Sequence, residues 1–551
     1  MSWVFCVLSH KPFVKWEIDK FLQTHKKTNN TIIKPSFYLA FADTKHNTTV
    51  HYDSYEQKSG WLVVGNAYLT KETGYGIAEK NDWKRLIDGT IDSQDMNGGY
   101  VIFKWNEQEI EVWNDTLGIQ DMFYTSSQGY TIIASRLDWL TNYLDKKPWN
   151  YSAFGAFALL PNMFVSQPFM KNVSRFGASS YLKAYNDKFT SGKRRIDLTD
   201  FKEPDINTYF FKLNKALTVY PDSQKKLLLQ SDDTTANRYT LSLLLNKAKD
   251  NWSMLEPYDK EELEQFTSFQ NTFNINSEHN PGIDDKKRLF NLWNQYILST
   301  FNSDIPAELN YIHFSNQLNK AGYNFMLHDF SHFYFRNYNY SINKSFIKAL
   351  NEDNISSIIK HFKVDYSWIR EEFSRFLKKG LAQHLQDFKS QLSMHSFIND
   401  EQRDEFIMLM LHGVHTHAHK LAFLNQYASF YNPNLHFDLI KARINLNTKP
   451  LILFKEYHNQ IARNYPELLF HIKAKEPKIK LASQTNSSVI LFRLFKQDII
   501  EKLNSIEAQR SPYYNHIKLQ KIISRANAED PKHINTLLKC YAFELVRSHF
   551  E

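Results

Sequence analysis

Residues 96 to 124 read MNGGYVIFKWNEQEIEVWNDTLGIQDMFY and contain two short apolar runs, GGYVIFKW and EIEVWN, separated by polar residues. Similar runs flank this stretch, namely WVFCVLS at 3–9, GWLVVGNAYL at 60–69 and YTIIAS at 130–135. Short apolar and aromatic runs between polar turns are typical of strands. The chain from Met1 to about Tyr185 is therefore predicted to form a layered β-rich domain.

From about Phe201 the pattern becomes helical, because apolar residues recur three and four positions apart at 206–217, 289–301, 404–428 and 487–504. Two mostly apolar runs, 225–229 and 323–327, are typical of strands buried on both faces of a parallel sheet. We therefore predict a β-rich domain at 1–185, a polar linker at 186–204 that carries a Lys-Arg-Arg cluster, and a helix-rich α/β domain at 205–551.

Composition excludes several classes of protein. The 67 basic and 59 acidic residues give a net charge of +8 without basic clusters, so nucleic acid is not an expected partner. The longest apolar stretch, 154–165, is too short to span a membrane and contains Pro161. Cys6 and Cys540 are too few for a disulfide framework, and the N-terminus lacks the features of a secretory signal, so we expect a cytoplasmic protein.

The segment at 96–124 resembles the L-D-G-x-F-A-F and R-D-x-x-G-I-x-P-L-Y-Y stretch of asparagine synthetases and related class II glutamine amidotransferases. Asn114-Asp115, Gly118-Ile119 and Phe123-Tyr124 fall in register with it, and Ala134-Ser135 with Leu140 resembles the F-A-S-E-x-K-x-L segment. Residues 151–182 resemble the domain-crossing helix and hairpin that follow. The resemblance implies a four-layer αββα domain of the N-terminal-nucleophile type.

The resemblance continues along the second domain. Residues 226–245 lie where the family has the S-G-G-x-D-S-S pyrophosphate loop, and 321–338 lie where it has its second motif, while 431–440, 455–475 and 534–550 resemble later segments in the same order. It implies an adenine nucleotide α-hydrolase-like ATP-pyrophosphatase domain with a helical C-terminal extension. ATP and Mg²⁺ are implied by this resemblance only, and no other cofactor is predicted.

The first reaction centre of the family is altered. A glutaminase of this type uses an N-terminal cysteine, freed by removal of Met1, whose α-amine serves as the base; here the position is Ser2, whose hydroxyl is harder to ionise. The N-G-E segment reads Val-Gly-Asn with Gly65 and Asn66, and Asn97 replaces the acidic residue of L-D-G. We expect a structural domain without glutaminase chemistry, with a serine-dependent glutaminase as the alternative.

The second reaction centre is altered in the same way. Glycine amides normally cradle the pyrophosphate and carboxylates hold Mg²⁺, and glycine is scarce here, at 16 of 551 residues or about 3% against an average of about 7%. The equivalent positions of the nucleotide cleft are Ser231, Asp232, Asp233, Thr235, His328, Asp329 and His332. Aspartates replace the loop glycines, Thr235 replaces a metal-binding aspartate, and His332 replaces another.

Two interpretations of these cleft residues are open. They could converge at the ends of two adjacent strands as a remodelled metal or ligand site, since open α/β sheets bind ligands there. Alternatively, they are polar loop residues that fill a vacated nucleotide cleft.

A histidine run, LHGVHTHAHK, follows in the chain. On an α-helix His412, His415 and His419 would share a face and could bind Zn²⁺ or Ni²⁺, although such runs are more often polar helix surface or capping histidines.

Two functions follow from the residues and the resemblance. One is a degenerate asparagine-synthetase-like pseudoenzyme that binds a peptide, a protein or a small ligand. The alternative is a divergent ATP-dependent amide-forming ligase, of the asparagine synthase or peptide-cyclase type, without glutaminase activity. The sequence leaves open whether the protein forms a homodimer.

Overall fold

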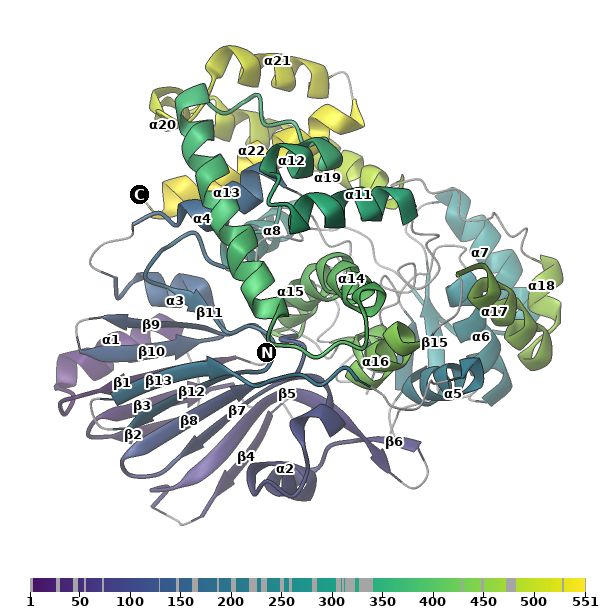
Figure 1. Ribbon diagram of the computed structural model, residues 1–551, viewed down its shortest axis with the longest axis horizontal. Coiled ribbons are helices and arrows are strands. Elements are labelled where there is room, and N and C mark those ends of the chain that lie inside the picture. Colours follow the sequence, from purple (N-terminus) through teal and green to yellow (C-terminus); the bar gives the residue numbers. More distant parts are fainter. Residues whose placement is uncertain are drawn as a thin grey trace.

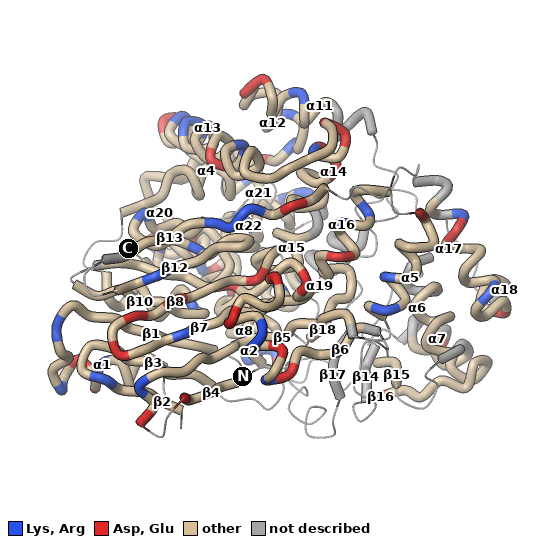
Figure 2. Tube along the Cα trace, turned by 60° about the horizontal axis from the view of Figure 1, so that its bottom comes forward, with Lys and Arg blue, Asp and Glu red and all other residues tan. Residues whose placement is uncertain are grey.

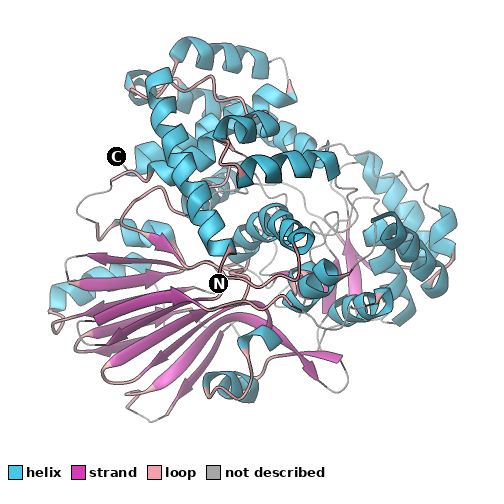
Figure 3. Ribbon diagram, viewed as in Figure 1, coloured by secondary structure: helices cyan, strands magenta, loops and turns pink. Residues whose placement is uncertain are grey.

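The computed structural model has a mixed α/β architecture with antiparallel sheets in its first part and many helices elsewhere (Figure 1, Figure 3). This confirms the predicted mixture of β-rich and helix-rich parts. None of the described helices combines the length and apolarity needed to cross a bilayer. The structure describes residues 3–25, 30–42, 48–53, 56–71, 74–127, 129–144, 148–160, 167–185, 188–199, 205–217, 225–228, 235–247, 252–256, 260–279, 285–303, 309, 312, 323–326, 340–427, 430–446, 450–471, 482–527 and 530–550.

Two antiparallel sheets dominate the first part of the chain. The first has the order β11-β9-β10-β1-β3-β2, with β1 (Val4–Ser9), β2 (Asn30–Lys34), β3 (Phe37–Phe41), β9 (Phe123–Ser127), β10 (Tyr130–Ala134) and β11 (Ser174–Arg175). The second has the order β13-β12-β8-β7-β5-β4, with β6 beside β5, and consists of β4 (Thr48–Tyr52), β5 (Gly60–Lys71), β6 (Gly74–Ile77), β7 (Asn97–Trp105), β8 (Glu109–Asn114), β12 (Ser180–Tyr185) and β13 (Lys188–Lys193).

Alternating side chains produce four layers from these sheets. Along β1, Val4 and Cys6 pack in a core shared with β5 and β7, whereas Phe5 and Val7 pack in a core shared with helices α1 (Lys15–His25) and α3 (Leu137–Thr141). The outer face of the second sheet packs on Trp83 of α2 (Lys80–Ile87). The order of layers is therefore helix, sheet, sheet, helix.

The turn that follows Asp115 is held together by the Asp115 side chain. Its buried carboxylate accepts backbone hydrogen bonds from Leu117, Ile119 and Gln120 at 2.9–3.0 Å. Gly118 in the same turn has a φ of +70°, and an added Cβ would lie 2.7 Å from the Ala178 nitrogen. The turn contains the residues whose spacing gives rise to the resemblance described from the sequence.

Five short strands in the second part pair in parallel in the order β16-β15-β14-β17-β18. They are β14 (Lys225–Leu228), β15 (Trp252–Leu255), β16 (Ser277–Glu278), β17 (Tyr323–Met326) and β18 (Phe430–Tyr431). Around them lie α5 (Ile206–Leu217), α6 (Thr235–Lys247), α7 (Lys260–Phe273), α17 (Pro450–Asn464) and α18 (Glu467–His471) (Figure 1). The predicted strands and the predicted helix at 206–217 are thus present.

The remaining described helices form the upper layer of Figure 1 and its junction with the sheets. They are α4 (Tyr151–Leu159), α8 (Lys286–Thr300), α11 (Tyr340–Asn351), α12 (Ile355–Phe362), α13 (Glu371–Leu392), α14 (Asp400–Leu409), α15 (Thr416–Leu424), α16 (Phe437–Asn445), α19 (Ala482–Leu503), α20 (Ile506–Arg510), α21 (His516–Asn527) and α22 (Pro531–Phe550). Acidic and basic residues are interspersed along the described chain (Figure 2).

Two expectations from the sequence need correction. The helical segment predicted at 404–428 is present as far as Leu424, but it is not one regular α-helix, because a π-helical segment, Met410–His415, separates α14 from α15. Within the predicted linker, β13 pairs with β12 and extends the second sheet. Its sequence, KFTSGK, is mostly polar, so it lacks the apolar signal of a strand.

Helices α4 and α13 cross in close contact through two glycines. A Cβ on Gly155 would lie 2.3 Å from the Leu377 carbonyl oxygen, and one on Gly380 would lie 2.1 Å from the Tyr151 carbonyl oxygen. Both obstacles are backbone, which cannot rotate away as a side chain can. The crossing therefore requires glycine on both helices and joins the two parts of the chain.

We predict that Gly380→Ala lowers the free energy of unfolding by at least about 1–3 kcal/mol, the usual cost of overpacking. Helix propensity alone predicts the opposite sign, a gain of about 1 kcal/mol. Urea unfolding measures the change, and Lys379→Ala, at the exposed neighbouring position, is the control. A stabilised Gly380→Ala protein would contradict the close crossing.

Candidate functional site

The positions equivalent to the family's glutamine pocket lie at one end of β5 and β7. Gly65 has a φ of +108°, and a Cβ there would lie 2.2 Å from the Gly99 carbonyl oxygen. Asn66 pairs with Gly99 in the β5–β7 ladder. Gly65 is thus required by the close approach of two strands.

Asn97, the third of these positions, is fully buried and bonded to the second part of the chain. Its Oδ1 accepts a hydrogen bond from the Asp438 backbone nitrogen at 2.9 Å, and its Nδ2 donates to Asp438 Oδ2 at 3.0 Å. Tyr75 also donates from its hydroxyl to Asp438 Oδ2, at 2.8 Å. Asp438 lies in the first turn of α16, where the helix dipole favours a carboxylate.

Aromatic side chains continue this contact beside Asp438. The Tyr68 ring stacks on His436 with centroids 5.2 Å apart, and His436 Nε2 is hydrogen-bonded to the Tyr431 hydroxyl at 2.8 Å. Because that hydroxyl donates to the Ala216 carbonyl oxygen, we assign the Nε2 proton to His436. Its Nδ1 has no hydrogen-bond partner among the described residues, and burial lowers the His436 pKa to about 4.

The nucleophile position, Ser2, lies outside the described residues. Cys6 is buried within β1, and burial raises the pKa of its thiol well above the ordinary value. A buried protonated thiol is a poor nucleophile. Cys6 is therefore not a candidate nucleophile in this structure.

The two cleft motifs follow neighbouring strands. β14 and β17 are adjacent and parallel, with Leu228 opposite Met326, so their carboxyl ends meet at one edge of the sheet. Six cleft residues lie outside the described part of the chain, namely Ser231, Asp232, Asp233, His328, Asp329 and His332. Thr235 begins α6, but its side chain is not described.

The histidine run lies at the junction of the two parts. His415 ends the π-helical segment, and His419 lies in α15, where it contacts a buried ion pair. Arg175 Nη2 donates to Asp121 Oδ2 at 3.2 Å, and Arg175 Nη1 lies 3.1 Å from His419 Nε2. Since arginine only donates, Nε2 is the acceptor, and His419 Nδ1–H donates to Asp121 at 3.2 Å.

This geometry bears on the metal hypothesis. Both ring nitrogens of His419 are engaged by Asp121 and Arg175, and the described residues contain no group of three or more metal-ligating side chains. The side chain of His412 is not described, so metal binding through it stays a prediction.

Other basic groups lie near the ion pair. The pKa of His415 is lowered to about 3, first by burial and then by the charges of His419, Lys193 and Arg175. Burial also lowers the pKa of Lys193 and lowers that of His395 to about 4, with a contribution from Lys193 to the latter. Uncharged imidazoles are therefore favoured here at neutral pH.

Sequence reasoning did not identify Asp121 and Arg175 as partners of the histidine run. Asp121 lies 298 positions from His419 and Arg175 lies 244 positions from it. No local spacing rule connects residues so far apart. A weak local signal is the charged residue Asp121, two positions after Ile119.

Comparison with protein-family models gave no match, and no curated protein matched. Among solved structures, the chain is similar to a glutamine phosphoribosylpyrophosphate amidotransferase from B. subtilis in complex with ADP and GMP, at 9% identity and a TM-score of 0.21. A structure described as the allosteric regulatory enzyme of purine biosynthesis matches at 10% identity and a TM-score of 0.21. Each match covers 50% of this chain and 65% of the other chain, so this chain spans less than two thirds of the length of the proteins that it matches.

We predict that Asp121→Asn lowers the free energy of unfolding by about 3–5 kcal/mol, because it leaves the Arg175 charge buried without its carboxylate. The triple variant Asp121→Leu, Arg175→Met, His419→Leu should recover most of this loss, because it removes the whole buried network. Chemical denaturation at pH 7 measures both. Equal loss in the two variants would contradict the explanation.

His436 should make the protein less stable in mild acid. Its folded pKa of about 4 lies below the ordinary histidine pKa of 6.5, so the unfolded chain binds more protons between these pH values. The contribution is complete above pH 6.5 and decreases by about 1.4 kcal/mol per pH unit as the pH falls toward 4. Denaturation between pH 7 and 4.5 should show a shallower decrease for His436→Gln, and parallel curves would contradict this.

Proposed function

We propose that this protein is an asparagine-synthetase-like pseudoenzyme that binds a peptide, a protein or a small ligand and lacks glutaminase chemistry. The observation that carries the proposal is the pairing of Asn97 with Asp438. At a position where the family has an acidic residue, both polar atoms of the Asn97 side chain bond one residue of α16. Because these two atoms form a structural contact with α16, they do not bind a substrate in this proposal.

The surrounding contacts support the same conclusion. Tyr75, Tyr68 and His436 continue the junction around Asp438 with a hydrogen bond and ring contacts. Replacing the Asp438 side chain would leave the buried Asn97 Nδ2 without its acceptor, at a cost of about 1–3 kcal/mol, while Oδ1 would still accept from the backbone nitrogen. In this proposal the N-terminal sandwich is a scaffold that holds the second part in place.

The ATP half of the proposal rests on sequence and strand order. The finer assignment, an ATP-pyrophosphatase-type domain, is supported by the adjacent parallel strands β14 and β17, each followed by one of the two altered motifs. Asp232 and Asp233 replace loop glycines, and carboxylates repel a polyphosphate unless a metal lies between them. We therefore propose that the strand-end cleft no longer transfers an adenylate.

The test is a pair of activity assays on the full-length protein. We expect no glutamine hydrolysis and no pyrophosphate release from ATP and Mg²⁺ with aspartate or peptide carboxylates, at enzyme concentrations where an asparagine synthetase turns over. Asp232→Ala with Asp233→Ala is the matched variant, and it should be indistinguishable from the wild type. Pyrophosphate release that this variant abolishes would establish the alternative, a divergent amide-forming ligase.

A further inference from the structure

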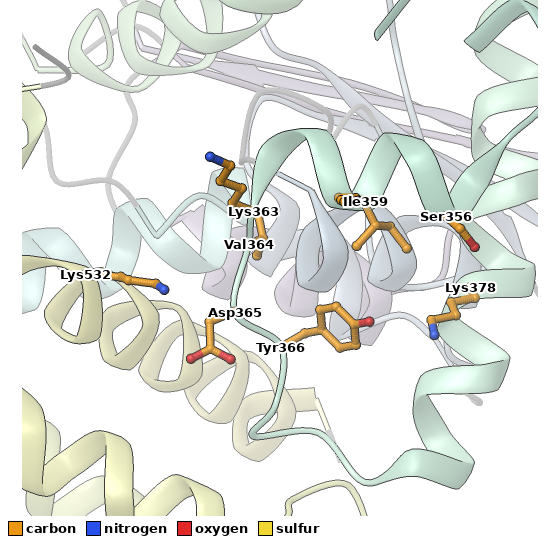
Figure 4. A pocket seen from close by; sticks show the side chains of 9 residues that line it. Ser356, Ile359, Lys363, Val364, Asp365, Tyr366, Lys378 and Lys532 are labelled. Carbon is orange, nitrogen blue, oxygen red and sulfur yellow. The ribbon is translucent and has the colours of Figure 1, made fainter. Parts of the chain in front are cut away.

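A cavity of about 560 Å³ lies in the helical layer, between α12, the start of α13 and the first turn of α22 (Figure 4). None of the glutamine-pocket, cleft or histidine-run residues lines it. Its size is within the range of pockets that hold small molecules, about 300–1,000 Å³. Its lining residues are Ser356, Ile359, Lys360, Lys363, Val364, Asp365, Tyr366, Lys378 and Lys532.

The lining is strongly basic. Four lysines and one aspartate give the cavity a net charge of +3 at neutral pH. The carboxylate of Asp365 already accepts a hydrogen bond from the Ser367 nitrogen at 2.9 Å. None of the four lysines forms an ion pair with a described residue. Among the described residues, no carboxylate therefore neutralises their charges.

The lysines come from separate elements, and all four residues are exposed. Lys378 lies on α13 and Lys532 on α22, and their ammonium groups point from opposite sides toward the middle of the cavity (Figure 4). The Lys378 ammonium lies 5.6 Å from the centre of the Tyr366 ring. This contact limits where the ammonium group lies and keeps it beside the cavity.

One wall of the cavity is apolar or aromatic. Ile359, Val364 and Tyr366 lie between the two ammonium groups in Figure 4. A ligand that satisfies this lining has charged groups at its two ends and an organic part between them. Phosphates suit the ends, because each carries up to two negative charges and several strong hydrogen-bond acceptors.

We propose that this cavity binds a small organic molecule that carries two phosphate groups, one held by Lys378 and the other by Lys532. Lys360 and Lys363 add positive potential, which attracts the anion and raises its rate of association. The concave shape and small volume favour a metabolite-sized anion over a nucleic acid backbone, which needs an extended basic surface.

Isothermal titration of the full-length protein with fructose 1,6-bisphosphate tests the proposal. This probe has two phosphates on a sugar and no base, so it does not address a nucleotide cleft. In 150 mM salt we expect a Kd below about 1 mM. The variant Lys378→Gln with Lys532→Gln should weaken binding at least about tenfold, because each loses a charge-assisted hydrogen bond.

The control is Lys518→Gln with Lys521→Gln, which removes the same charge from exposed positions of α21, outside the cavity. It should bind like the wild type, and thermal unfolding shows whether either variant has lost its fold. Pyrophosphate is titrated in parallel, and equal affinity for it would identify the phosphates as the recognised groups without the organic part. No binding of either probe, or equal weakening in both double variants, would overturn the proposal.

Discussion

The junction between the β-sandwich and α16 is the contact on which the rest of the interpretation depends. Asn97 and Asp438 form a reciprocal pair of hydrogen bonds, one to the backbone and one between side chains, in which Asn97 is fully buried and Asp438 is half-buried. The contact is costly to break, because the fully buried Asn97 amide would be left without hydrogen-bond partners. Both polar atoms of the Asn97 side chain therefore take part in the contact between the β-sandwich and α16.

A buried ion pair with a histidine forms a second contact between the two parts of the chain. The buried Asp121–Arg175 pair meets His419 from α15, just after the π-helical segment. A π-helical turn contains one more residue than an α-helical one and therefore rotates the side chains that follow it. The segment lies where His419 must reach Asp121, which explains the interruption of a regular helical pattern.

The sequence predicted those elements whose signal is local. Residues 109–114 form β8 and residues 206–217 form α5, because apolar spacing within one element decides both. β13 was missed, since its mostly polar sequence becomes a strand only by pairing with β12. The lysine cavity could not be predicted either, because it joins Lys378 and Lys532, which are distant in the chain.

The candidate site was predictable to a similar degree. Gly65 and Asn97 were identified as altered pocket positions, but the sequence could not show that Asp438 occupies both ends of the Asn97 amide. That information is tertiary, since the two residues are 341 positions apart. The predicted cleft residues follow β14 and β17 in the chain, and these two strands are adjacent and parallel. Which residues stand at the cleft positions can be read from the sequence alone.

The coupling free energy between Asn97 and Asp438 tests the central claim most directly. A double-mutant cycle with Asn97→Ala, Asp438→Ala and the combined variant, followed by urea unfolding, measures it. If the pair is a structural contact, the coupling should be about 0.5–3 kcal/mol, as for residues in direct contact. A coupling near zero would show that the side-chain hydrogen bond between Asn97 and Asp438 does not stabilise the junction, and would contradict the account.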